Sequence, residues 1–121
     1  MLNPKDDIRI RHMFDYSREA ILLAEKRGRP DLDADRMLQL SLVRLVEIVG
    51  EAASRVSVDT RQRYSQIPWP QIASMRNRLI HGYDFVDYDI LWQTVTEDLP
   101  ALVAALEPLV PTLRQDQESE P

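Results

Sequence analysis

The residues best suited to chemistry lie in the segment MRNRLIHGY, residues 75–83, which contains Arg76, Asn77, His81 and Tyr83. A histidine, with an ordinary pKa near ~6.5, can take up or release a proton at neutral pH, and an arginine can hold phosphate oxygens through paired hydrogen bonds. In RNA the 2′-hydroxyl is an internal nucleophile, so a proton acceptor, a charge stabiliser and good positioning are sufficient for cleavage without a metal. Together, His81 and Arg76 could cleave a phosphodiester bond, and Asn77 could orient either the phosphate or the imidazole.

The spacing of these residues permits such a site and leaves an alternative open. On an ideal helix Asn77 and His81 share one face, because residues four apart nearly superpose. Gly82 favours a break, which could swing His81 and Tyr83 towards Arg76. In the alternative, Arg76 pairs with a nearby carboxylate and His81 only hydrogen-bonds at a helix terminus.

A second group of polar residues, Arg44, Glu47 and Glu51, lies at helical spacing upstream of this segment. Ion pairs between residues three and four apart within one helix are enough to explain it. A supporting role is the alternative, in which Glu47 or Glu51 orients Arg76 across the fold. No histidine is spaced from acidic residues in the way that a metal site requires, so we expect neither a metal nor another cofactor.

The elements that must position these residues are predicted to be helices throughout. Apolar residues recur every three or four positions, and neither strand-like alternation nor an Asn-Gly or Asp-Gly turn is present. The pattern predicts an all-α fold, a compact bundle of four to five helices. We expect a first helix over residues 6–26, closed by Gly28 and Pro30, and a second over 34–56, capped by Asp33 or Asp35. A glycine inside the second helix, Gly50, predicts a close helix crossing.

The remaining helices enclose the segment that carries the chemistry. Pro70 suits the first turn of a third helix over residues 70–81, and Gly82 can adopt the left-handed conformation that ends it. Asp87 can cap a last helical segment over residues 87–110, which Pro100 kinks or splits. We expect residues 1–113 to form a single domain and residues 114–121 to form an acidic, flexible tail.

Composition narrows the class of protein. A chain of 121 residues with 44% hydrophobic residues can bury one core, and the absence of cysteine excludes disulfides. A net charge of −5 argues against general attraction to nucleic acid, so any RNA-binding surface must be local. The chain shows no signal peptide and no apolar run long enough to cross a bilayer, so we expect a cytoplasmic protein.

The segment RNRLIHGY resembles the Arg-x4-His-x-Tyr motif of the HEPN-domain ribonuclease toxins, specifically the HepT-like family. The resemblance extends over nearly the whole chain. It includes LVEIVGEAA in the second predicted helix, IPWPQIASMRNRLIHGY around the motif, and FVDYDILWQTVTEDLPAL after it.

This resemblance implies a HEPN-like helical bundle that forms a homodimer, in which the motifs of both protomers line one cleft and cut RNA without a metal. It implies that Arg76, Asn77 and His81 are catalytic. It also implies a toxin-antitoxin pair, in which a minimal nucleotidyltransferase antitoxin of the MntA type adds AMP to the motif tyrosine, here Tyr83. The alternative is a noncatalytic subunit that binds nucleotide or partner within a nucleotidyltransferase complex.

Overall fold

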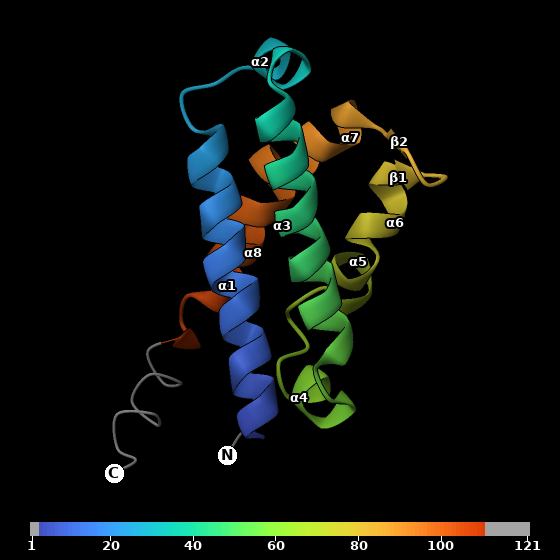
Figure 1. Ribbon diagram of the computed structural model, residues 1–121. Helices are drawn as coiled ribbons and strands as arrows, with labels where there is room; N and C mark the ends of the chain where they lie inside the picture. The colour runs from blue at the N-terminus through green and yellow to red at the C-terminus, as the bar shows by residue number, and fades with distance from the viewer. Residues whose placement is uncertain (1–2, 111–121) are drawn as a thin grey trace.

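Two long helices form the centre of the protein. A computed structural model describes residues 3–110, in which α1 (Pro4–Ala24) and α3 (Arg36–Arg55) pack along each other (Figure 1). Both helices lie within two residues of the predicted bounds. Their apolar stripes are buried as the periodicity predicts, with Ile10, Met13, Phe14 and Ala20 on α1 facing Leu38, Leu42, Leu45 and Val49 on α3 in one core.

The connection between these helices contains a short helix, α2 (Arg29–Ala34), that was not predicted. Gly28 and Pro30, interpreted above as a helix end, instead begin this turn. The backbone N–H of Gly28 donates to Asp31 Oδ2 at 2.7 Å, and Pro30 is in the first turn, where its fixed φ suits a helix. Asp35 then caps α3 as predicted, because its Oδ1 accepts from the N–H of Leu38 at 3.0 Å.

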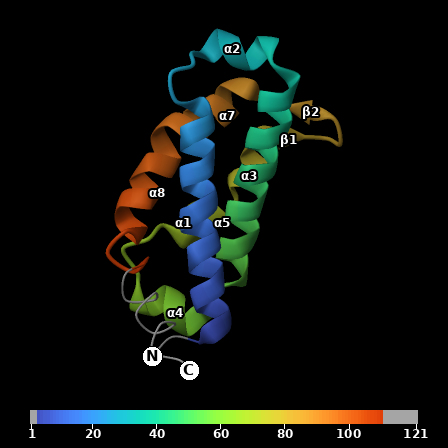
Figure 2. The same cartoon turned by 60° about the vertical axis from the view of Figure 1, so that its left-hand side comes forward.

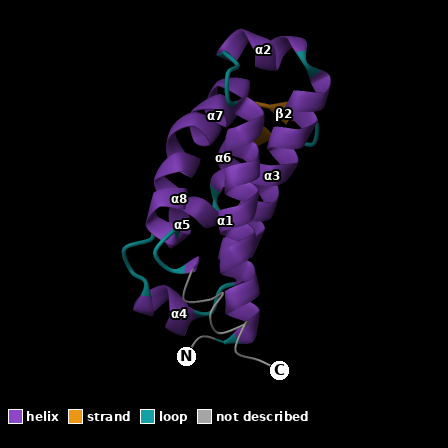
Figure 3. Cartoon of the chain, turned by 90° about the vertical axis from the view of Figure 1, so that its left-hand side faces the viewer, coloured by secondary structure: helices purple, strands orange, loops and turns teal. Residues whose placement is uncertain are grey.

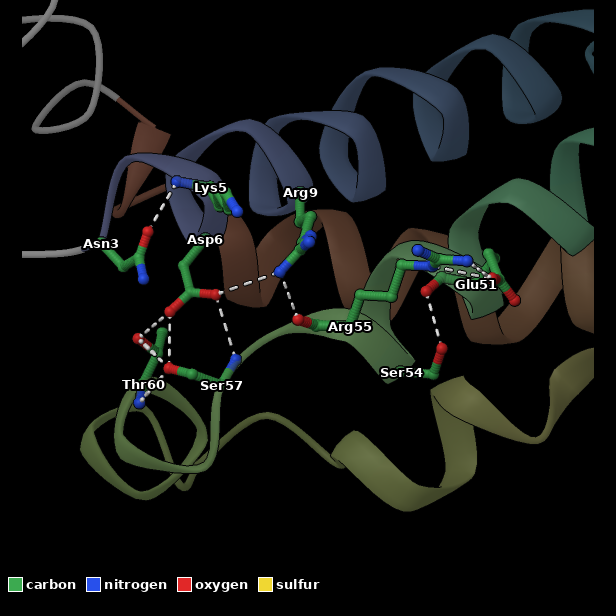
Figure 4. A network of polar contacts seen from close by, with 9 residues as sticks. All are labelled: Asn3, Lys5, Asp6, Arg9, Glu51, Ser54, Arg55, Ser57 and Thr60. Atoms are coloured by element: carbon green, nitrogen blue, oxygen red, sulfur yellow. Dashed lines mark hydrogen bonds and ion pairs between the residues drawn. The ribbon is translucent and has the colours of Figure 1, made fainter.

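A second short helix, α4 (Val58–Arg63), is tied to the start of α1 by a buried carboxylate (Figure 4). Asp6 is 1% exposed and accepts hydrogen bonds from Ser57 N (3.0 Å), Ser57 Oγ (2.6 Å) and Thr60 Oγ1 (2.7 Å). Burial alone would raise the pKa of Asp6. The hydrogen bonds from Ser57 and Thr60, helped by the charge of Arg9, outweigh burial and lower that pKa. The carboxylate therefore fixes the end of the bundle at which α4 lies.

The third predicted helix is divided in two and ends early. It consists of α5 (Trp69–Ala73) and α6 (Met75–Leu79), separated at Ser74. The close crossing predicted at Gly50 is confirmed, since a Cβ there would lie 3.2 Å from the carbonyl oxygen of Ile72 and 3.5 Å from that of Ala73. Helix α5 can approach α3 this closely only because Gly50 has no side chain.

The chain then forms a small hairpin, which corrects the expectation of helices throughout. Strands β1 (Ile80–His81) and β2 (Phe85–Val86) pair antiparallel, and the N–H of Asp87 donates to the carbonyl of Leu79 at 2.7 Å. Gly82 has a φ of +75°, so it is left-handed as predicted, but it serves a turn between strands rather than a helix end. Figure 3 shows these strands, in orange, as the only strands among the helices and loops of residues 3–110.

The last helical segment is continuous from Tyr88 to Leu106 but widens ahead of Pro100. Helix α7 (Tyr88–Gln93) is capped by Asp87, whose Oδ1 accepts from the N–H of Ile90 at 3.1 Å, as predicted. A π-helical turn, η1 (Thr94–Asp98), leads into α8 (Leu99–Leu106), with Pro100 in its first turn. The wide turn accommodates the proline ring, which would clash with a carbonyl four residues back in a continuous α-helix. Figure 2 shows α8 and α3 on opposite sides of α1.

The expectation of a helical fold is confirmed in its main part, because residues 3–110 are mostly helical. Within that range no helix is both long enough and apolar enough to cross a membrane. The predicted acidic tail over residues 114–121, and the last residues of the predicted domain, lie outside the described part of the chain.

Candidate functional site

All four motif residues lie on one exposed unit, helix α6 and the hairpin that follows it. Arg76 and Asn77 are on α6, His81 is in β1, and Tyr83 is in the turn between the strands. The Arg76 side chain is 55% exposed, and Tyr83 is 98% exposed. Figure 1 shows the hairpin projecting from the edge of the helical body. The unit is therefore accessible to a large ligand.

A hollow of about 430 Å³ lies between this unit and helix α3. Arg76, Tyr83 and Glu47 all line it, so the structure brings together three of the residues singled out by sequence. Asp84 of the hairpin also lines the hollow. Among residues 3–110, no three histidine or acidic side chains are grouped so that they could hold a metal ion. The hollow thus presents arginine and carboxylate groups to solvent.

Glu47 is the residue of α3 that contacts Arg76. The Nε of Arg76 lies 3.9 Å from Glu47 Oε2, and Arg44 Nη1 lies 3.6 Å from the same oxygen. Glu47 thus makes both the pair within its own helix and the contact with Arg76 that its supporting role would need, and that role stays a prediction. Glu51 does not reach Arg76 and instead pairs with Arg55 on its own helix, at 2.8 Å. The carboxylate partner of Arg76 therefore comes from α3 rather than from the hairpin.

His81 is not among the residues that line the hollow. Its backbone pairs with Phe85, and the two rings stand 5.9 Å apart at 45°. Because α6 ends at Leu79, the expectation that Asn77 and His81 share one helix face is wrong. Successive residues of a strand point to opposite sides, so Ile80 faces the hollow and His81 points away from it. Within one chain, Arg76 and His81 are both exposed, but only Arg76 lines this hollow.

Sequence reasoning missed a polar network on the other side of the hollow. Arg36, Gln39 and Tyr88 all line it. The hydroxyl of Tyr88 donates to Gln39 Oε1 at 3.0 Å, and Arg36 Nη1 donates to the same oxygen at 3.1 Å. Arg36 and Tyr88 are the first residues of α3 and α7. The predicted caps Asp35 and Asp87, which directly precede them, were the signal in the sequence that could have drawn attention to these two positions. Nothing in the spacing showed that these two helix starts meet.

The chain matches the family described as "Ribonuclease HepT-like" over residues 13–109, which include the whole motif. It is 40% identical over 95 residues to "Probable ribonuclease HepT" of Thermococcus cleftensis, across 75% of this chain and 86% of that protein. It is 27% identical over 118 residues to "Putative RNase MJ1216" of Methanocaldococcus jannaschii, across 96% of this chain and 98% of that protein. No solved structure matches it significantly. The resemblance noted in the sequence is confirmed, and the chain belongs to the HepT-like ribonuclease family.

Proposed function

We propose that this chain is an endoribonuclease that cuts RNA without a metal, with Arg76, Asn77 and His81 as its catalytic residues. Membership of the HepT-like ribonuclease family supports RNase activity and therefore an RNA substrate. The observation that carries the proposal is the exposure of all three side chains on α6 and the strand directly after it. A polynucleotide can reach them without any opening of the fold.

The proposed chemistry uses the nucleophile already present in RNA. His81 accepts the proton of a 2′-hydroxyl, whose oxygen attacks the adjacent phosphorus, while the bond from phosphorus to the 5′-oxygen breaks and that oxygen takes up a proton. The products are a cyclic phosphate and a free 5′-hydroxyl. Arg76, which contacts Glu47, stabilises the charge on the phosphoryl oxygens, and Asn77 positions the phosphate.

We further propose that the active species is a homodimer in which the motifs of two protomers line one cleft. Two observations support this. His81 is absent from the hollow that holds Arg76 of the same chain, so a second copy can supply the missing imidazole. Large apolar side chains are exposed beside the site, with Leu40 54% exposed on α3 and Phe85 59% exposed on the hairpin, and exposed apolar side chains of this kind often mark interfaces.

The regulation proposed is that of a cytoplasmic toxin, neutralised when a nucleotidyltransferase antitoxin of the MntA type adds AMP to Tyr83. Support comes from the position of Tyr83, which is 98% exposed on the hairpin and lines the same hollow as Arg76. The transferred adenylyl group would add bulk and a negative phosphate beside the guanidinium that must hold RNA. Modification would therefore exclude the substrate by both volume and charge.

The nuclease proposal is tested by incubating RNA with purified protein in the presence of a chelator. The wild type should cleave it, and His81→Ala should not. The matched control is His12→Ala, which removes the other histidine, exposed on α1 next to Tyr16. It should leave cleavage unchanged. RNA left intact by folded wild-type protein would overturn the nuclease and favour the noncatalytic binding subunit.

The regulatory proposal has a separate test. Incubation with ATP and a nucleotidyltransferase of this type should join the Tyr83 oxygen to the α-phosphorus of ATP with release of pyrophosphate, which raises the mass of the wild type by one adenylyl group and abolishes cleavage. Tyr83→Phe should keep the unmodified mass and remain active in the same mixture. Modification of Tyr83→Phe to the wild-type extent would place the target on another residue.

A further inference from the structure

Arg36 is the second arginine of the hollow, and its charge is balanced differently from that of Arg76. Its guanidinium contacts two neutral groups, Gln39 Oε1 at 3.1 Å and the hydroxyl of Tyr88 at 3.5 Å. No ion pair joins Arg36 to a carboxylate within residues 3–110, whereas Arg76 has Glu47. Arg36 therefore places an uncompensated positive charge at the edge of the hollow in a chain whose net charge is −5.

The groups that hold Arg36 are themselves fixed. Gln39 is only 9% exposed, and its Nε2 donates to the carbonyls of Leu32 at 2.8 Å and Asp33 at 3.4 Å. Both donor positions of the amide are thus used by backbone, which leaves Oε1 to accept from Tyr88 and Arg36. A cation held by neutral acceptors is positioned without being neutralised. Binding an anion there needs little further ordering of the side chain.

Arg36 is not needed to hold helices α3 and α7 together. The hydrogen bond from Tyr88 to Gln39 already joins the start of α7 to α3. Arg36 is exposed, and its two hydrogen bonds, to Gln39 and Tyr88, only supplement this link, so its removal affects packing little. The distinctive property that Arg36 brings to the hollow is its charge.

We propose that Arg36 binds a phosphate of the RNA other than the one that is cut, an inference that rests on the proposed ribonuclease function. Arg36 and Glu47 are both on α3, separated by about 16 Å along the helix at ~1.5 Å per residue, and Arg76 lies against Glu47. The RNA strand therefore runs along α3, with its scissile phosphate near Arg76 and a phosphate further along the strand, beyond the adjacent one, at Arg36. Two carboxylates also line the hollow, and neither pairs with Arg36. Asp84 lies on the hairpin, and Glu47 is already paired with Arg76.

The test compares two substrates, an RNA oligonucleotide and a dinucleoside monophosphate that contains only the scissile phosphodiester. For Arg36→Gln, KM on the oligonucleotide should rise about tenfold or more while kcat stays unchanged, because a charge-assisted contact to a non-reacting group is lost. The slope of the logarithm of oligonucleotide affinity against the logarithm of salt concentration should become shallower, by roughly the contribution of one phosphate contact. Both constants for the short substrate should equal those of the wild type.

Three further variants sharpen the comparison. Arg36→Lys keeps the charge and should recover part of the loss in KM. Tyr88→Phe keeps Arg36 but removes one of the groups that hold it, so a smaller rise in KM is expected, which preserves the test if Arg36→Gln folds poorly. The matched control is Arg18→Gln, which changes an exposed arginine on α1 that lies over Phe14 at 5.6 Å and lines no part of the hollow. It should change neither constant.

The outcomes separate this inference from the function on which it rests. If the wild type cleaves RNA and Arg36→Gln has wild-type KM on the oligonucleotide, the phosphate contact is wrong and the nuclease stands. An equal loss on both substrates, or a change from dimer to monomer in sedimentation, would assign Arg36 to structure or to a subunit interface. If the wild type neither cleaves RNA nor binds 2′-O-methyl RNA in fluorescence anisotropy, both proposals fail together.

Discussion

The carboxylate of Asp6 should control the acid stability of this protein. It is buried and accepts three hydrogen bonds, from Ser57 N, Ser57 Oγ and Thr60 Oγ1 at 2.6 to 3.0 Å. A single hydrogen bond to a charged group contributes about 1.5 to 3 kcal/mol to stability. The contributions of several bonds to one carboxylate are not additive, and the cost of removing the charge from water offsets part of their sum. Asp6→Ala should therefore lower the free energy of unfolding by about 3 kcal/mol. Asp6→Asn, which keeps one acceptor oxygen, should lower it by roughly half as much.

The same contacts predict how stability depends on pH. The pKa of Asp6 is lowered in the folded protein from its ordinary value of 3.8, so the folded state favours the ionised carboxylate. This contribution to stability is fully present above the unfolded pKa and is lost as the pH falls through the folded pKa. Between pH 5 and pH 3, the wild type should therefore lose more free energy of unfolding than Asp6→Asn does.

Urea unfolding followed by far-UV circular dichroism at pH 7, 5, 4 and 3 measures these differences. The control is Asp15→Asn, which changes an exposed carboxylate on the same helix and should shift stability by less than about 0.5 kcal/mol. Parallel loss of stability in the wild type and Asp6→Asn down to pH 3, or a change below about 1 kcal/mol in Asp6→Ala at pH 7, would refute the reasoning.

Three other substitutions test the elements that position the site, each by urea unfolding at pH 7. Gly50→Val should reduce stability by more than about 2 kcal/mol, because its Cβ would stand 3.2 Å from the carbonyl of Ile72; a neutral effect would mean that α5 moves easily. Gly82→Ala meets no atom within 4 Å, so only the strain of its φ of +75° applies, about 1 kcal/mol, and a larger loss would contradict this. Asp87→Ala should cost about 1 kcal/mol as the cap of α7, whereas an unchanged midpoint would exclude that cap.

The elements predictable from sequence were those specified by local chemistry. The long helices have clear apolar periodicity, and the caps Asp35 and Asp87 use a short-range bond from side chain to backbone. Helices α2 and α4 were missed because each contains only 6 residues, too few to display a helical period. Both depend instead on burying single residues, such as Leu32 of α2, against the larger helices.

The hairpin was missed for a different reason. RNRLIHGY has the composition of a helix followed by a glycine stop, and Gly82 takes a left-handed φ in either structure. The outcome depends on a bond between segments, from the N–H of Asp87 to the carbonyl of Leu79, which draws the chain back on itself. The helix propensity of a short segment does not predict such a bond, because its two partners lie on either side of the turn.

Part of the candidate site followed from residue types, and the rest required the fold. Sequence left open whether Glu47 or Glu51 lies against Arg76, and in the structure Glu47 does, whereas Glu51 pairs with Arg55. The approach of Arg36 and Tyr88 depends on how α3 and α7 pack, which no spacing within either helix reveals. The catalytic roles of the motif residues, the homodimer and the antitoxin stay predictions.

The position of Tyr83 at the end of a two-stranded hairpin has a kinetic consequence. A phenol that is 98% exposed on a protruding loop can enter the active centre of another enzyme while the helices behind it stay packed. The rate at which an enzyme transfers a group to the Tyr83 hydroxyl should then rise with the concentration of that enzyme. At urea concentrations that neither unfold this protein nor inactivate the enzyme, the rate should not change. A protein with such a tyrosine is open to modification in its native state, at a rate set by encounter with the enzyme rather than by local unfolding.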